Sequence, residues 1–216
     1  MKTENIHVLG DSHTGMYFGD RYRADDGHSV RDYKNLRFSE SHNWTIGGAT
    51  IYGLLKENSR SKCIPNIRER LNEGLEHIVC TFGEVDVRNH IRRFLNGRTI
   101  EEGVSEVVSK YEQFLNSIIK LHVSGKILVT GGIPYYQEFG EALDKGATPP
   151  LYIFTNELDR QINEMCLKNG FLCVSVLNDI TSGQWTTKDY LEDEVHLKCS
   201  KLFPILGEKI IKLLAP

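Results

Sequence analysis

Four short apolar runs, separated by longer amphipathic stretches, constrain the fold of this 216-residue chain most strongly. Each run is rich in β-branched or other strand-forming residues, which is typical of a buried strand, whereas the stretches between them have helical periodicity. Strands that alternate with helices predict an α/β fold, in which helices cover both faces of a central parallel sheet in three layers. The runs are Ile6–Leu9, Ile78–Phe82, Ile127–Thr130 and Leu172–Val176, and a weaker strand is expected near Asn43–Ile46.

The clearest predicted helix covers Thr99–His122. Thr99 and Glu102 match the capping box that begins many helices, and the apolar residues that follow them make one stripe. Three further helices are less regular: Tyr152–Leu167, which Gly170 is expected to end, then Lys201–Leu214, and a short one at Ile67–Leu75.

Composition and charge exclude several classes of protein. The length suits one domain over residues 1–216 with a substantial core. The formal net charge is −3 and the basic residues are dispersed, so no nucleic-acid surface is expected. No apolar stretch approaches the roughly 20 residues that a membrane-spanning helix needs. The first apolar run, Ile6–Leu9, is too short for a signal peptide, so we expect a cytoplasmic protein.

The cysteines and histidines predict neither disulfides nor a metal. The five cysteines are unclustered and several, such as Cys80 and Cys173, lie within apolar segments, so we interpret them as buried free thiols in a reducing compartment. No set of His, Asp and Glu residues has convincing metal-ligand spacing, so we predict no metal and no cofactor.

Three segments follow predicted strands directly and should meet on one rim of the sheet. In parallel sheets, ligands bind at the carboxyl ends of the strands. The segments are residues 10–13, 83–86 and 131–134. The stretch 131–150, rich in Gly, Pro and Tyr, is expected to be a long loop beside the site, either a lid or specificity loop or an ordinary surface connection.

Ser12, Asp193 and His196 supply the three side chains of an activated serine. A serine hydroxyl needs a base within hydrogen-bond reach, and the base needs an orienting acid. We therefore predict Ser12 as nucleophile, His196 as base and Asp193 as its orienter. Ser12 follows a strand and precedes a helix, where backbone N–H groups stabilise an oxyanion. The plainer alternatives are that Ser12 only caps the helix, that His196 is an ordinary histidine at a helix start, and that Asp193 belongs to a solvated acidic run.

These residues resemble the sequence blocks of the SGNH, or GDSL-type, hydrolase superfamily. Residues 10–12 match the block that carries the nucleophile, and Asp193-x-x-His196 matches the block that carries acid and base. Asn43, with Gly48 five residues later, looks like the block whose glycine N–H joins the oxyanion hole, although Gly48 also suits a plain turn. The resemblance spans nearly the whole chain and implies a flavodoxin-like α/β/α sandwich.

The third block departs from that family. The family pattern is Gly-x-Asn-Asp, whose asparagine donates to the oxyanion, whereas residues 83–86 read Gly-Glu-Val-Asp. Val85 cannot donate, and the loss of one such donor costs roughly 10²–10³ in turnover. The segment looks like a Gly-Glu-Ile-Asp-x-Arg variant of SGNH-like proteins associated with surface-polysaccharide and glycan assembly.

Residues near Val85 are candidates for the missing donor and for substrate contacts. Arg88 could direct its guanidinium at an oxyanion, a phosphate or a carboxylate, and Asn89 could supply an amide. An ion-pair network that only positions the loop is an equal alternative. The other candidates for contact with substrate are Glu84, Asp86, His90 and His13. His13 follows the nucleophile directly, and its alternative role is to cap the rim of the sheet.

The resemblance implies a serine esterase that acts on a small-molecule or glycan ester, in particular an O-acyl group of a carbohydrate. Acyl transfer in glycan assembly by the same three side chains is one alternative. A non-catalytic SGNH-like binding module is another, because of Val85. Neither the acyl group nor the oligomeric state follows from the sequence.

Overall fold

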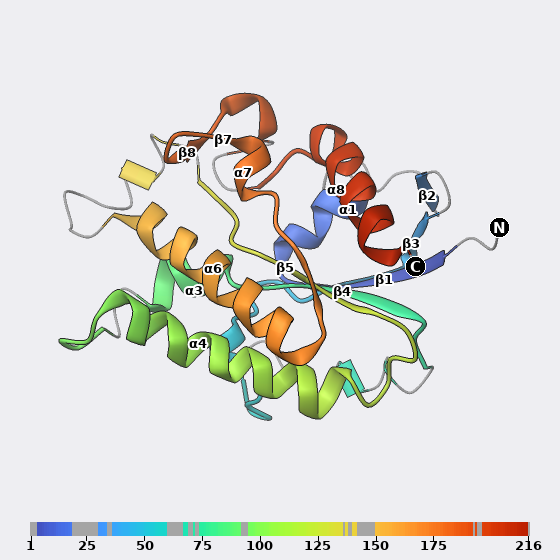
Figure 1. Cartoon of the computed structure of the whole chain (residues 1–216), viewed down its shortest axis with the longest axis horizontal. Helices are drawn as coiled ribbons and strands as arrows, with labels where there is room; N and C mark the ends of the chain where they lie inside the picture. The colour runs from blue at the N-terminus through green and yellow to red at the C-terminus, as the bar shows by residue number, and fades with distance from the viewer. Residues whose placement is uncertain are drawn as a thin grey trace.

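One six-stranded sheet crosses the molecule, in the order β2-β3-β1-β4-β5-β6 (Figure 1). The computed structural model describes residues 4–18, 30–33, 36–59, 67–68, 71, 74–91, 95–135, 137, 140–141, 150–191, 193 and 196–215. The strands are β1 (Glu4–Gly10), β2 (Val30–Tyr33), β3 (Leu36–Thr45), β4 (His77–Thr81), β5 (Ile127–Thr130) and β6 (Leu172–Val174). Strands β3, β1, β4, β5 and β6 run parallel, which confirms the predicted central parallel sheet. β2 pairs antiparallel with β3 at one edge and was not predicted.

Helices cover both faces of this sheet (Figure 1). α4 (Ile100–Phe114) and α6 (Leu151–Asn169) pack on one face, and α1 (Gly15–Phe18) and α8 (Cys199–Leu214) pack on the other. The predicted three-layer α/β/α arrangement is therefore confirmed.

Alternate strand residues divide between two hydrophobic clusters, one on each face. Leu9 and Cys80 belong to the cluster beneath α4 and α6, whereas their neighbours Val8 and Val79 belong to the cluster beneath α1 and α8. Successive side chains of a strand point to opposite faces, so a strand buried on both sides must be apolar at every position. This requirement explains the continuous apolar runs in the sequence.

Short elements connect the strands and long helices. They are η1 (Ser12–Thr14), η2 (Ile51–Gly53), α3 (Glu84–Asp86), η3 (Val87–Ile91), η5 (Leu115–Ile119), α7 (Leu177–Ile180), β7 (Thr181–Ser182), β8 (Trp185–Thr186) and η6 (Lys188–Tyr190). No helix among the described residues is long and apolar enough to span a bilayer.

The predicted helix signals are confirmed where the structure describes them. Thr99 caps α4 in the expected capping box with Glu102, and Gly170 ends α6 in the left-handed conformation with φ 72°. α4 continues through the wider turn η5 only to Ile119. α8 begins at Cys199, two residues before the predicted Lys201.

Two predicted segments fall partly outside the described residues. Of the short helix expected at Ile67–Leu75, residues 67, 68 and 71 are helical, whereas Leu75 pairs in a β-bridge with Val123. Of the long loop 131–150, residues 131–135 have no regular structure and residues 137, 140 and 141 are helical.

Candidate active site

Ser12 lies at the turn that directly follows β1. The last residue of β1, Gly10, is aligned with Thr81 of β4, and the N–H of Asp11 donates to the Thr81 carbonyl oxygen at 3.0 Å. A Cβ atom at position 10 would lie 2.2 Å from that oxygen, so only glycine lets the two strands end so close together. Ser12 therefore begins η1 at the carboxyl edge of the sheet, where α/β proteins bind ligands.

Asp11, and not Ser12, caps this helical turn. Its carboxylate accepts a hydrogen bond from the backbone N–H of His13 at 2.9 Å. The capping role that the sequence left open for Ser12 thus belongs to its neighbour. The hydroxyl of Ser12 is left for another partner.

The structure brings Asp193 and His196 to Ser12 from the other end of the chain. His196 Nε2 lies 3.1 Å from Ser12 Oγ, and His196 Nδ1 lies 2.7 Å from Asp193 Oδ2. The other oxygen of Asp193 accepts the backbone N–H of His196 at 2.7 Å. The three side chains form one hydrogen-bonded row, in the order that an activated serine requires.

An antiparallel bridge between Leu191 and Leu197 closes the loop that carries Asp193 and His196. Lys198 N–H also donates to the carbonyl oxygen of Tyr190 at 2.7 Å. Leu191 and Leu197 are buried in the cluster that includes α1, the helix next to η1. Packing against α1 therefore holds this late loop beside Ser12.

The loop after β3 lies next to the Ser12 turn. Thr45 is paired with Gly10, and Ile46 N–H donates to the Gly10 carbonyl oxygen at 2.7 Å. Gly48 follows in the left-handed region with φ 69° and is exposed. The backbone N–H groups of Ser12 and Gly48 donate to no acceptor among the described residues. An oxyanion hole requires backbone donors that are not engaged elsewhere.

Glu84 and Arg88 form an ion pair in the segment that replaces the family's third block. Arg88 Nε lies 2.8 Å from Glu84 Oε1, and Nη2 donates to Oε2 at 3.3 Å. Glu84 is buried, whereas the Arg88 side chain is 30% exposed. The carboxylate thus contacts one edge of the guanidinium, as in the ion-pair alternative that the sequence left open. Val85 is buried, and its apolar side chain offers no donor.

Asp86 anchors the backbone of η2. Its oxygens accept the N–H groups of Ile51 at 2.7 Å and Tyr52 at 3.1 Å, and the residue is fully buried. Burial raises the pKa of this carboxyl to about 7, with a smaller contribution from the charges of Asp11 and Glu84. Both oxygens are occupied and enclosed, so Asp86 has a structural role instead of the predicted contact with substrate.

His13 is also placed differently from its prediction. It is buried rather than on the rim, and its ring Nδ1 lies 3.1 Å from the Asp11 carboxylate. In this position His13 contacts Asp11 and the ring of His196. Asn89 is half-buried in η3, and the side chains of Asn43 and His90 lie outside the described part of the chain.

Sequence reasoning missed two residues that support this site. Asp11 received no role, although an aspartate two residues before a histidine at a helix start is a recognisable capping signal. Tyr135 donates its hydroxyl to the Glu84 carbonyl oxygen at 3.0 Å and is fully buried. No local pattern distinguishes that tyrosine from its neighbours, because the contact joins segments 51 residues apart.

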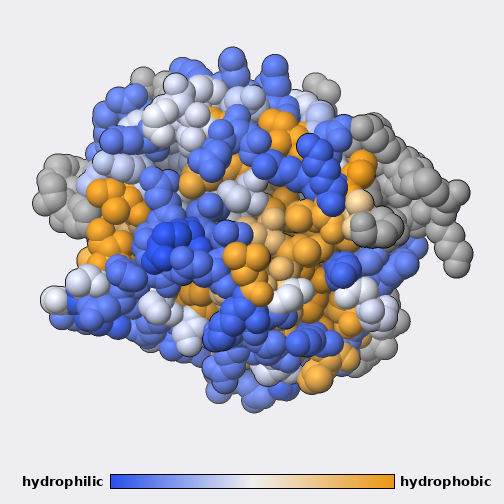
Figure 2. Space-filling view, in the orientation of Figure 1, coloured by the Kyte–Doolittle hydropathy of each residue, from blue (hydrophilic) through white to orange (hydrophobic). Residues whose placement is uncertain are grey.

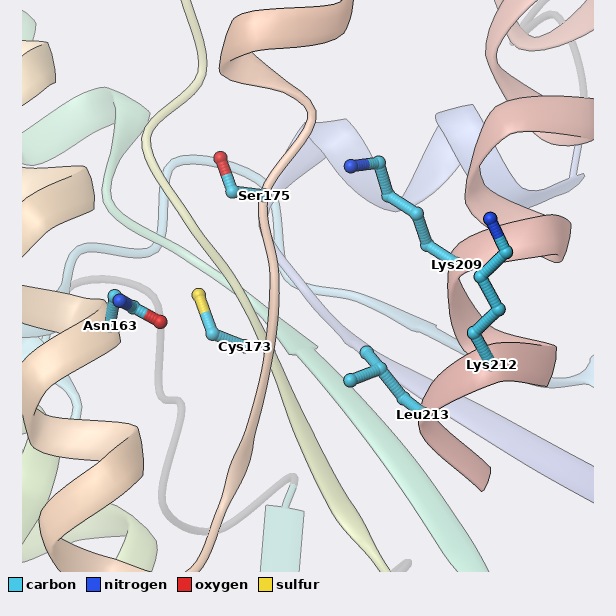
Figure 3. Close-up of a pocket in the computed structure, with 6 residues that line it drawn as sticks. All are labelled: Asn163, Cys173, Ser175, Lys209, Lys212 and Leu213. Carbon is cyan, nitrogen blue, oxygen red and sulfur yellow. The ribbon is translucent and has the colours of Figure 1, made fainter. Parts of the chain in front are cut away.

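A separate cavity of about 290 Å³ lies between α6 and α8, over the edge strand β6 (Figure 3). Figure 2, in the orientation of Figure 1, shows a face on which apolar residues lie between more hydrophilic ones. None of the predicted site residues lines the cavity. Its lining residues are Asn163, Cys173, Ser175, Lys209, Lys212 and Leu213. Among the residues that the structure describes, no group of three His, Cys, Asp or Glu side chains could hold a metal ion.

Comparison with known proteins identifies the fold. No protein-family model and no curated protein matches the sequence. Solved structures do match over nearly the whole chain. An acetylxylan esterase from Geobacillus stearothermophilus matches with a TM-score of 0.59 and 14% identity, over 100% of this chain and 95% of that one. A carbohydrate acetylesterase from Sinorhizobium meliloti matches with a TM-score of 0.58 and 13% identity, over 97% and 99%. A GDSL-like lipase from Bacteroides thetaiotaomicron matches with a TM-score of 0.58 and 14% identity, over 98% and 88%.

Proposed function

We propose that this chain, which has the fold of GDSL-type acylhydrolases, is a serine esterase that removes an O-acyl group from a carbohydrate or glycan intermediate. The observation that carries the proposal is the 3.1 Å contact between His196 Nε2 and Ser12 Oγ. Asp193 Oδ2 lies 2.7 Å from the opposite ring nitrogen, Nδ1, and with the proton of the neutral ring on Nδ1 the nitrogen that faces Ser12 accepts the hydroxyl proton.

The reaction proceeds through an acyl-enzyme. Ser12 Oγ attacks the ester carbonyl carbon while its proton passes to His196 Nε2, and Asp193 stabilises the imidazolium that forms. When the tetrahedral intermediate collapses, the bond to the alcohol oxygen breaks and His196 returns the proton to that oxygen. Water then attacks the acyl-enzyme by the same route, which releases the acid and restores Ser12.

The oxyanion is bound by the backbone N–H groups of Ser12 and Gly48, which donate to no other described residue. Asn89 supplies the third donor in place of Val85. The engagement of Arg88 by Glu84 supports this choice, as does the half-buried amide of Asn89, which bonds to no other described residue. Arg88 then positions the loop that carries Asn89.

The substrate class is supported by two observations. Two of the similar structures are an acetylxylan esterase and a carbohydrate acetylesterase. Residues 83–88 look like the variant associated with glycan assembly. A cytoplasmic location is part of the proposal and is supported by the free thiols of Cys80, Cys166 and Cys173.

A fluorophosphonate probe and an aryl acetate test the proposal. Stoichiometric labelling at Ser12 and acetate release are expected for the wild type. Ser12→Ala should abolish both, whereas Ser105→Ala, on the exposed side of α4, should change neither. Equal rates for wild type and Ser12→Ala would reject the serine mechanism. Acetylated xylo-oligosaccharides, with and without an unacetylated acceptor, then distinguish hydrolysis from acyl transfer by their products.

A further inference from the structure

The imidazole of His13 lies beside the imidazole of His196. Their ring centroids are 5.3 Å apart and their planes are inclined by 34°. His13 directly follows Ser12 in η1, whereas His196 comes from the far end of the chain. The residue after the nucleophile thus contacts the residue proposed as its base.

Asp11 fixes the position of the His13 ring. One oxygen of Asp11 accepts the backbone N–H of His13 at 2.9 Å and faces the ring Nδ1 at 3.1 Å. Both side chains are 0% exposed. A single buried carboxylate therefore fixes both the backbone and the ring of His13, and the ring forms a rigid surface behind His196.

The outer pair, Asp193 and His196, is less enclosed than this inner pair. The Asp193 side chain is 49% exposed and that of His196 is 26% exposed. Solvent-exposed ion pairs contribute little to holding a side chain in one geometry. On its buried side the His196 ring meets the ring of His13, which limits how far the imidazole can turn away from Ser12.

We propose that His13 is a positioning residue for His196: its ring, held by Asp11, keeps the His196 imidazole in the rotation that directs Nε2 to Ser12 Oγ. The inference rests on the proposed function, because it concerns the base of that reaction. His13 does not touch the substrate, since its side chain is enclosed. The chain therefore has two Asp–His pairs, of which the outer transfers the proton and the inner holds the outer in place.

Two variants separate the ring of His13 from its hydrogen bond. His13→Phe keeps a flat ring but loses the bond to Asp11, and His13→Asn keeps a side-chain N–H near the Nδ1 position but loses the ring. We expect His13→Asn to lower kcat for an aryl acetate by about 10- to 100-fold with KM within about twofold, because misplacing a catalytic group acts on the chemical step. His13→Phe should lose less, about fivefold in kcat, because its ring stays enclosed beside His196 although the bond to Asp11 is gone.

If the role of His13 is purely structural, His13→Asn should be more active than His13→Phe, because only the asparagine preserves the contact with Asp11. That order, with the Phe variant inactive and the Asn variant active, would overturn the proposal. If His13→Asn does not fold, as judged by thermal unfolding, His13→Leu takes its place. Leucine provides neither the flat ring nor the hydrogen bond, so we expect the same fall in kcat, and wild-type turnover would overturn the proposal.

Nuclear magnetic resonance of the His196 ring nitrogens provides a test that needs no turnover. In the full chain, we expect one tautomer with the proton on Nδ1, and a mixture of tautomers or broadened signals in His13→Asn. Unchanged His196 signals in that variant would overturn the positioning role. Absence of wild-type Ser12 labelling by a fluorophosphonate would instead reject the proposed function, so the two failures are distinguishable.

Discussion

Asp86 accepts the backbone N–H of Ile51 at 2.7 Å, and this bond joins the segment after β4 to the loop that begins η2. The same carboxyl accepts Tyr52 N–H at 3.1 Å. The two loops that border the Ser12 turn are therefore fixed to one another by one buried acid. Its environment also makes stability depend on pH.

We expect Asp86 to make the protein less stable as pH rises from about 4 to about 7. Burial raises the pKa of its carboxyl from 3.8 to about 7, so the folded protein binds a proton there that the unfolded chain has released. The stabilising contribution of this group is complete below pH 4 and is lost as pH rises through 7. Between pH 5 and pH 8 this loss is expected to be about 2–3 kcal/mol.

Urea unfolding of wild type and Asp86→Asn at pH 5 and pH 8 measures this effect. The asparagine does not titrate, so the difference in unfolding free energy between the two proteins isolates Asp86 from all other groups. The wild type should lose more stability than the variant between the two pH values. If the difference in unfolding free energy between the two proteins is the same at pH 5 and pH 8, the raised pKa of Asp86 is contradicted.

The residues that sequence reasoning identified correctly have local signals. The capping box at Thr99 and the end of α6 at Gly170 are each encoded within a few residues, and the buried strands are encoded by continuous apolar runs. β2 was missed because its sequence, Val-Arg-Asp-Tyr, has little apolar character and only one neighbour in the sheet. An edge strand lacks the burial that makes inner strands recognisable.

The residues of the site also divide into those that a local sequence pattern identifies and those that it does not. The spacing of Ser12, Asp193 and His196 is a motif and could be recognised, and the structure places these side chains in contact. The anchoring of η2 by Asp86 depends on how two distant loops are aligned, which no local pattern encodes. The contact between the rings of His13 and His196 is equally a product of packing.

Gly10 and Gly15 should respond oppositely to substitution by alanine. A Cβ at Gly10 would lie 2.2 Å from the Thr81 carbonyl oxygen, so Gly10→Ala must push β1 and β4 apart, at a cost of about 3 kcal/mol in unfolding free energy. Gly15 has helical φ, and a Cβ atom there would meet no other atom within 4 Å, so Gly15→Ala should be neutral or stabilise by about 0.5 kcal/mol. Thermal unfolding of the two variants measures both changes in stability. Equal changes would contradict the close approach of β1 and β4.

Asp193→Asn should reduce kcat for an aryl acetate by about 100-fold, with little change in unfolding free energy. The amide oxygen takes over the hydrogen bond from the His196 backbone N–H, so the NH2 group faces Nδ1 and favours the wrong tautomer. This exchange costs up to about 10⁴ in an enclosed triad. We expect the lower value because the Asp193 side chain is 49% exposed, so water can replace part of its role. Asp189→Asn, on the exposed part of η6, is the matched control and should retain wild-type turnover.

Asn89→Ala should lower kcat by about 100-fold if Asn89 supplies the donor that Val85 cannot, since one oxyanion donor is worth roughly 10²–10³ in turnover. Val85→Asn, which restores the family's donor position, should then recover part of the activity in the Asn89→Ala background and add little in the wild type. This non-additivity is the expected mark of two donors that serve one oxyanion. Equal gains in kcat from Val85→Asn in both backgrounds would show that Asn89 does not serve the oxyanion. Arg88 would then be the next candidate for the third donor.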